Sequence, residues 1–208
     1  MKSELAPSSD GPARLIEEVR ARYDGGHRSH QLGAFGEHDW RRCQEALARV
    51  RGPDVLLIGV GAGQMYDVLA RLPSIGRLIG FDEVRDERLV PGDRGALELG
   101  SFLRLPHPDR SFDTVVCLDV LHHVAAIAIA KVLHEARRVC RGTLVATVPY
   151  EGTEPLARRA EPGRGAAALP QRFTEETIDR WFPLAERTLI PRGEATSPWL
   201  LLVERQAP

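Results

Sequence analysis

Short apolar runs separated by helical patterns constrain the fold of this chain more than any other feature. Residues 55–60 read Val-Leu-Leu-Ile-Gly-Val, a continuous apolar run of strand length. Such a run is typical of a parallel strand that helices cover on both faces, whereas a half-exposed strand alternates apolar and polar residues. The chain therefore belongs, on its pattern, to the α/β class.

The rest of the chain repeats this unit of strand, turn and helix. We expect helices near residues 13–23, 37–50, 65–72, 126–139 and 174–181. We expect strands near residues 55–60, 77–81, 96–99, 112–118, 142–148, 185–190 and 199–204. The pattern predicts a Rossmann-like, doubly wound sheet of about seven strands, mostly parallel, with an antiparallel C-terminal hairpin.

At 208 residues the chain has the length of one domain. We expect a flexible N-terminus over 1–12 and a single domain over 13–208. Within that domain we expect the following parts: N-terminal helices (13–52), a ligand-binding core (53–150), a long loop (150–170), and a final helix with the hairpin (171–208).

Composition excludes several classes of protein. The 28 Lys and Arg residues nearly balance the 29 Asp and Glu residues, so nothing in the net charge favours nucleic acid or an anionic membrane as a partner. The three cysteines match no metal-ligand spacing and indicate free thiols in a reducing compartment. No signal peptide or membrane span is evident, which predicts a cytoplasmic monomer or homodimer.

A glycine-rich turn, Gly59-Val-Gly61-Ala-Gly63, follows the first strand. Closely spaced glycines at this point let a ligand approach the backbone, although a plain structural bend has the same composition. The dinucleotide fingerprint G-x-G-x-x-G fails in both frames, because its third glycine falls on Gln64 or Tyr66. No phosphate-binding loop with Gly-Lys-Ser/Thr is present either.

Asp82 ends the second strand, about twenty residues beyond the glycine turn. A carboxylate there accepts hydrogen bonds from ribose hydroxyls, unless it is only a solvated strand end. Adenosine without a pyrophosphate is the ligand that this combination favours.

Three segments carry a family resemblance: VLLIGVGAG, IGFD and LRLPHPDRSFDTVVCLDVLHHV. Together they resemble the successive motifs of class I S-adenosylmethionine-dependent methyltransferases, closest to a small bacterial branch, over residues 53–150. The resemblance implies the cofactor S-adenosylmethionine and the product S-adenosylhomocysteine. It also implies a cofactor site formed by Gly59, Gly61, Gly63, Asp82, Ser101, Phe102 and Leu118.

In that resemblance the three glycines pass beneath the methionine part, Asp82 holds the ribose, and Leu118 lines the sulfonium region with its carbonyl. Ser101 and Phe102 lie beside the adenine. The chain departs from the family pattern at Leu57 and Ser101, where the family usually has acidic residues. Glu98 or a backbone group is a candidate substitute.

The segment Asp119-Val-Leu-His122-His123 follows the fourth strand, where the methyl acceptor would lie. We expect His122 to act as a general base with Asp119 beside it, since the ordinary pKa of histidine suits that role. A structural role for both histidines is the alternative. A metal site formed by Asp119, His122 and His123 is a further alternative, but we expect no metal.

The sequence favours a methyltransferase acting on a small-molecule acceptor, at oxygen or nitrogen. The alternative is a catalytically silent, methyltransferase-like binding subunit, which the departures at Leu57 and Ser101 favour. A nucleotide-dependent oxidoreductase fits the glycine spacing poorly. We expect the acceptor pocket to use ring-bearing residues of the N-terminal helices and the long loop: Tyr23, His27, His30, Trp40 and Tyr150. Arg158, Arg159, Arg164 and Arg172 in or next to the long loop are candidates to meet an anionic acceptor, although a solvated loop is the simpler reading.

Overall fold

The computed structural model describes residues 11–24, 37–84, 95–152, 173–192 and 197–206. Across these ranges one eight-stranded sheet forms the centre of the molecule. Its strands are β1 (Asp54–Ile58), β2 (Arg77–Asp82), β3 (Gly95–Leu99), β4 (Phe112–Leu118), β5 (Cys140–Gly152), β6 (Phe173–Thr174), β7 (Glu186–Ile190) and β8 (Trp199–Arg205). The helices are α1 (Gly11–Asp24), α2 (Glu37–Leu47), α3 (Gln64–Leu69), α4 (Ala126–Val139) and α5 (Glu175–Trp181), with a short 3-10 turn at Leu121–His123.

The strand order is β3-β2-β1-β4-β5-β8-β7, with β6 paired to β5 outside this path. Strands β1 to β5 run parallel, whereas β8 is antiparallel to both β5 and β7. The predicted doubly wound sheet with an antiparallel hairpin is thereby confirmed. The sequence reading missed β6, because a two-residue strand leaves no periodic pattern.

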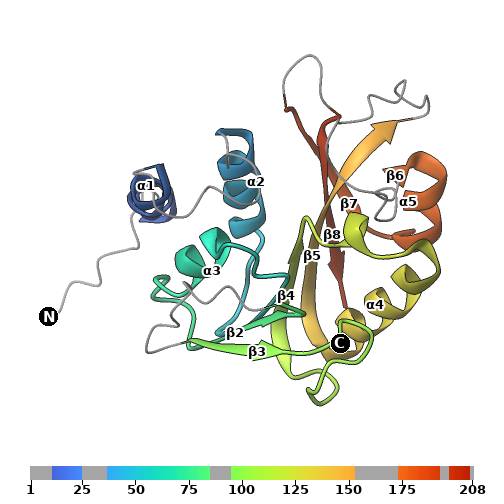
Figure 1. Cartoon of the computed structure of the whole chain (residues 1–208), viewed down its shortest axis with the longest axis horizontal. Coiled ribbons are helices and arrows are strands. Elements are labelled where there is room, and N and C mark those ends of the chain that lie inside the picture. Colours follow the sequence, from blue (N-terminus) through green and yellow to red (C-terminus); the bar gives the residue numbers. More distant parts are fainter. Residues whose placement is uncertain (1–10, 25–36, 85–94, 153–172, 193–196, 207–208) are drawn as a thin grey trace, which may run out of the picture.

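Each face of the sheet has its own apolar core. Helices α1, α2 and α3 lie on one side and α4 and α5 on the other (Figure 1). Along β1, Val55 and Leu57 belong to the core under α1–α3, and Leu56 and Ile58 to the core under α4 and α5. Successive strand side chains point to opposite faces, so two covered faces require the continuous apolar run seen in the sequence.

Several boundaries differ from the predicted ones. Strand β1 ends at Ile58 because Gly59 has a φ of 77°, which turns the chain out of the sheet. Strand β5 continues to Gly152, so the first residues of the predicted 150–170 loop extend the sheet. The remainder of that loop, with its four arginines, lies outside the described residues, as do residues 1–10 and two of the proposed pocket residues, His27 and His30.

Charged side chains join the strands at the edge where the parallel strands begin. The Arg141 guanidinium lies 2.7 Å from carboxylate oxygens of both Asp54 and Asp113, and Arg77 Nε lies 3.0 Å from Asp54. The hydrogen bond from Arg141 is the main cause that lowers the pKa of Asp54 and of Asp113. Charges at this edge therefore serve structure, and the opposite edge, where the parallel strands end, is the place to look for a ligand site.

The three cysteines are buried as free thiols, in agreement with the sequence reading. Burial raises the pKa of Cys43 to about 11 and that of Cys117 to about 12, so neither is a reactive thiolate. Among the described helices, none has the length and apolar character needed to cross a bilayer.

Candidate functional site

The glycine turn connects β1 to α3 through three residues with positive φ: Gly59 (77°), Gly61 (54°) and Gly63 (94°). A methyl group on Gly59 would overlap the Cγ2 of Val120, which follows β4, so glycine is required there by contact as well as by φ. A methyl group on Gly61 would meet no atom within 4 Å. The backbone at Gly61 therefore has open space beside it, as an approaching ligand would need.

The Asp82 carboxylate stabilises this turn through hydrogen bonds. Its Oδ2 accepts the N–H groups of Val60 (2.8 Å) and Gly61 (3.0 Å), and its Oδ1 accepts those of Glu83 (2.7 Å) and Val84 (3.3 Å). An ionised carboxylate offers about four acceptor positions, so backbone donors already occupy all of them. The role of Asp82 in binding a ribose stays a prediction. Ribose hydroxyls would have to share the carboxylate oxygens with these N–H groups or displace them.

Ser101 and Phe102 follow β3 and lie beside β2, as the sequence reading required for a common site. The Ser101 hydroxyl is exposed and lies 3.4 Å from Glu83 Oε1, which also accepts the Phe102 N–H at 3.4 Å. Glu98, the predicted substitute acid, lies 3.5 Å from His107 Nε2 instead. Within the described part of the chain, the carboxylate that contacts Ser101 is thus that of Glu83, which the sequence analysis did not single out.

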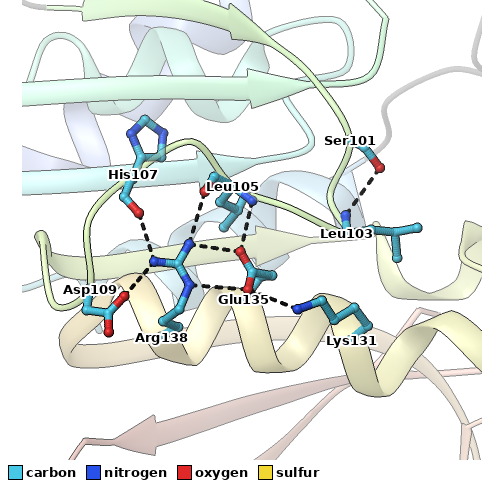
Figure 2. Close-up of polar contacts among 8 residues, drawn as sticks. All are labelled: Ser101, Leu103, Leu105, His107, Asp109, Lys131, Glu135 and Arg138. Carbon is cyan, nitrogen blue, oxygen red and sulfur yellow. Dashed lines mark hydrogen bonds and ion pairs between the residues drawn. The ribbon is translucent and has the colours of Figure 1, made fainter.

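An ion-pair cluster around the buried Glu135 holds the segment that carries Ser101. Arg138 donates all five of its N–H groups, to Glu135, Asp109 and two backbone carbonyls, those of Leu105 and His107 (Figure 2). Glu135 also accepts the Leu105 N–H at 3.0 Å and Lys131 Nζ at 3.2 Å. These bonds attach the connection between β3 and β4 to α4.

That cluster faces a surface cavity of about 590 Å³, lined by Leu103, Arg104, Leu105, Pro106, His107, Pro108, Lys131, Glu135 and Arg138. The Glu135 carboxylate and the Arg138 guanidinium have every hydrogen-bonding position filled by protein partners. The cavity therefore offers a ligand no unsatisfied charge from this pair.

Asp119 and His122 meet just beyond β4. His122 Nδ1 lies 3.2 Å from Asp119 Oδ1, and Arg42 Nη1 of α2 lies 3.1 Å from Asp119 Oδ2. Asp119 has a φ of 60°, a conformation uncommon for a residue with a side chain. The two residues predicted as catalytic are therefore brought together, and Arg42 joins them from 77 residues earlier in the chain.

The exposed His123 ring lies beside that of His122, with the ring centroids 3.8 Å apart and the planes tilted by 43°. Among the described residues, no group of three or more His, Cys, Asp or Glu side chains is arranged to hold a metal ion. The metal alternative gains no support from this geometry.

The ring-bearing residues assigned to an acceptor pocket divide into different roles. Tyr23 and Trp40 are core residues, and the Tyr23 hydroxyl donates to Asp67 of α3 at 2.9 Å. Tyr150 donates to Glu175. Trp199 of β8 is buried, and the Arg42 guanidinium carbon lies 4.2 Å from its ring centroid. Trp199 thus borders the Asp119–His122 pair, with its ring centroid 6.3 Å from that of His122.

Leu57 and Leu118 lie on β1 and β4, the strands on which the sequence analysis placed them. Leu57, which replaces an acidic residue of the family pattern, has no exposed surface and packs in the core under α1–α3. Leu118 ends β4 beside Asp119 and is 7% exposed. The position of Leu57 has thus been filled by apolar packing.

Comparison with known proteins finds similarity to methyltransferases. A family model described as a methyltransferase domain matches residues 56–143. A demethylmenaquinone methyltransferase of Deinococcus radiodurans is 33% identical over 112 residues, which cover 50% of this chain and 45% of that protein. The matched region thus spans less than half the length of that relative.

Two solved structures share the fold over nearly the whole chain. The first is 1,6-didemethyltoxoflavin-N1-methyltransferase of Burkholderia thailandensis, crystallised with 1,6-didemethyltoxoflavin and S-adenosylhomocysteine; it has 18% identity, a TM-score of 0.65, and coverage of 100% of this chain and 94% of that one. The second is the [4+2]-cyclase SpnF, with 14% identity, a TM-score of 0.63, and coverage of 98% and 97%. At these identities the likeness concerns the fold. Residues 56–143 are therefore similar to a methyltransferase domain, and the chain has the Rossmann-like fold of these solved structures.

Proposed function

We propose that this protein is an S-adenosylmethionine-dependent methyltransferase acting on a small-molecule acceptor, at oxygen or nitrogen. One observation carries the proposal. The glycine turn, Asp82 and the Asp119–His122 pair follow β1, β2 and β4, three adjacent parallel strands, at the same edge of the sheet. Ligands of doubly wound sheets bind at that edge.

The glycine turn fits the cofactor. The open space at Gly61 admits a ligand against the backbone, and Leu118 ends β4 next to this turn. The relative from Burkholderia, which shares the fold, was crystallised with S-adenosylhomocysteine. When bound, S-adenosylmethionine supplies a methyl group on a positively charged sulfur, and its loss leaves the neutral thioether.

On the acceptor side, His122 takes the proton that the acceptor loses as its oxygen or nitrogen forms the new bond to carbon. Asp119 lies against Nδ1 of His122, which favours the proton on that nitrogen and leaves Nε2 as the basic atom. Arg42, whose side chain is 5% exposed, orients the Asp119 carboxylate from the other side. Arg42 is thus a positioning residue for the pair.

A silent binding subunit is the second candidate, and two observations favour it. Leu57 is packed in the core, so no acid is available at its position. All four acceptor positions of Asp82 are filled by backbone donors. The fold itself does not decide between the candidates, because fold alone does not determine function.

Titration calorimetry with S-adenosylmethionine and S-adenosylhomocysteine separates the two candidates. We expect saturable binding of both, and transfer of a labelled methyl group to a member of a panel of hydroxyaromatic compounds and amines. No binding at millimolar concentration would favour the silent subunit.

The variant His122→Ala tests the catalytic assignment. We expect it to bind S-adenosylhomocysteine as the native protein does and to lose about 10²–10⁴-fold in transfer rate, as removal of a general base commonly does. The matched control is His123→Ala, which removes the neighbouring ring and should leave most of the rate. Equal loss in both variants would refute the role of His122.

We further propose a cytoplasmic location, since three buried free thiols suit a reducing compartment. The near-neutral net charge gives nucleic acid no electrostatic advantage as an acceptor, which is why a small molecule is proposed.

A further inference from the structure

We infer that Asp39 of α2 is a second positioning residue for the proposed catalytic base and sets the proton affinity of His122 through Arg42 and Asp119. This inference rests on the proposed function. Arg42 Nη2 lies 3.5 Å from Asp39 Oδ1, and Arg42 Nη1 lies 3.1 Å from Asp119 Oδ2. Asp119 Oδ1 in turn lies 3.2 Å from His122 Nδ1. Each shared residue uses a different atom for each partner, so the three contacts hold at the same time.

The Arg42 guanidinium is at the centre of this chain of contacts and is largely shielded from water. Its side chain is 5% exposed, and its guanidinium carbon lies 4.2 Å from the ring centroid of Trp199. The Asp39 side chain, three residues earlier on the same helix, is 20% exposed. Water and salt therefore screen these charges less than at an open surface, so the charge of Asp39 acts beyond its direct contact with Arg42.

A buried thiol on α2 responds to all three charges. Burial raises the pKa of Cys43 to about 11, Arg42 opposes that increase, and Asp39 and Asp119 add to it. One small group thus lies within the electrostatic range of both acids and of the guanidinium between them. The cluster is compact enough for the charge of Asp39 to reach Asp119.

The charges in this chain favour a proton on His122. Two carboxylates share one guanidinium, so the four residues carry a net charge of −1 while His122 is neutral and are balanced when it is protonated. Because Arg42 divides its attraction between the two acids, the Asp119 carboxylate keeps more of its negative potential for His122. Loss of the Asp39 charge therefore lowers the proton affinity of His122 in two ways: one anion is removed, and Arg42 pairs with Asp119 alone.

Other titratable groups border the pair and leave this balance unchanged. The Arg192 guanidinium carbon lies 4.4 Å from the Trp199 ring centroid, and Glu151 lies on β5 two residues past the strand partner of Trp199. These two charges are opposite in sign. The His123 ring centroid lies 3.8 Å from that of His122, so a proton on His123 would oppose one on His122. The substitutions that test the inference alter none of these groups.

Asp39 also has an ordinary role in α2, which the test has to separate from the proposed one. It lies in the first turn of the helix, where an acid stabilises the positive end of the helix dipole. Glu37 shares that turn and is exposed. Glu37→Gln therefore removes an equal charge from the same turn while the contact between Asp39 and Arg42 stays in place, and it is the matched control.

The test follows the His122 ring by NMR titration of the full chain, with its resonance identified by its absence in His122→Ala. We expect Asp39→Asn to lower the titration midpoint of His122 by at least about 0.5 pH unit. Asp39→Glu, which keeps the charge, and Glu37→Gln should both stay within about 0.2 pH unit of the native midpoint. Thermal unfolding should lower the melting temperature similarly in Asp39→Asn and Glu37→Gln, because each loses one acid of the first turn.

The outcomes separate this inference from the proposed function. With an acceptor that the panel identifies, the acid limb of the transfer rate in Asp39→Asn should move to lower pH by the same amount as the midpoint. A midpoint in Asp39→Asn within about 0.2 pH unit of the native value, or an equal shift in Glu37→Gln, overturns the inference whatever the transfer assay shows. If the shift occurs but the protein neither binds S-adenosylhomocysteine nor transfers a methyl group, the proposed function fails and the action of Asp39 on His122 stands.

Discussion

Replacement of Glu135 by glutamine tests the cluster that attaches the β3–β4 connection to α4. Glu135 is 4% exposed, and its two oxygens together accept two N–H groups of Arg138, the Leu105 N–H and Lys131 Nζ. An amide keeps only one oxygen and places an NH₂ group against donors. Glu135→Gln therefore leaves the partly buried Arg138 with an incomplete partner and at least one donor facing another donor.

The magnitude follows from the pKa of Glu135, which hydrogen bonding from Arg138 lowers from 4.5 to about 2. At 1.36 kcal/mol for each pKa unit, the ionised carboxylate contributes about 3 kcal/mol to the free energy of unfolding. For a chain of this size, such a loss lowers the melting temperature by roughly 6–12 °C.

The pH dependence has a definite sign. Because the folded pKa lies below the unfolded one, the contribution is complete above about pH 4.5 and is lost as the pH falls through 2. The difference in unfolding free energy between the native protein and Glu135→Gln should thus be largest at pH 7. It should already be smaller by roughly 1 kcal/mol at pH 3.5.

Urea unfolding at pH 7 and pH 3.5 measures both differences. The matched control is Glu176→Gln on α5, an exposed carboxylate paired with Arg180 at 2.9 Å, which should change stability by less than about 0.5 kcal/mol. Hydrogen exchange of the Leu105 amide should rise in Glu135→Gln alone. A loss under about 1 kcal/mol at pH 7, or an equal loss at both pH values, would refute the reasoning.

Three further substitutions test the glycine turn and its strand. Asp82→Asn should lower the melting temperature and weaken S-adenosylhomocysteine binding at least tenfold, because an amide cannot accept four N–H groups. Unchanged affinity in calorimetry would show that Asp82 does not bind the ribose. Leu57→Asp should destabilise the fold by about 3 kcal/mol or more without tighter binding, because the new carboxylate is buried without a cation; tighter binding would show that the missing acid limits affinity. Gly59→Ala should strongly destabilise the folded protein, and adding Val120→Ala should restore only part of the lost stability, because the φ of 77° still costs an alanine about 1–2 kcal/mol. Full recovery of stability in urea unfolding would contradict this cost.

The sequence alone predicted most of the fold, because its signals are local and repeated. The run at β1 places apolar residues on both faces, and the helix expected over 126–139 occurs at those residues. The ends of helices and strands were harder to predict. Gly59 ends β1 through its φ, and β5 continues past the predicted end, which no apolar pattern specifies.

Site residues were predictable where a motif carries them and not elsewhere. The pairing of Asp119 with His122 could be read from their spacing of three residues. Arg42 could not, because it reaches Asp119 only through packing of α2 against the sheet. Glu83 was passed over because an acid beside an acid has no distinctive pattern, and only the folded chain shows that Asp82 faces the glycine turn and Glu83 faces Ser101.

The place of β8 in the sheet affects how the chain acquires its structure during synthesis. β8 lies between β5 and β7, so β7 leaves the ribosome before the strand it pairs with exists. Until residues 199–205 emerge, β5 has an open edge that offers unpaired N–H and C=O groups to other chains. A nascent chain stalled before Trp199 is therefore open to aggregation through this edge of β5.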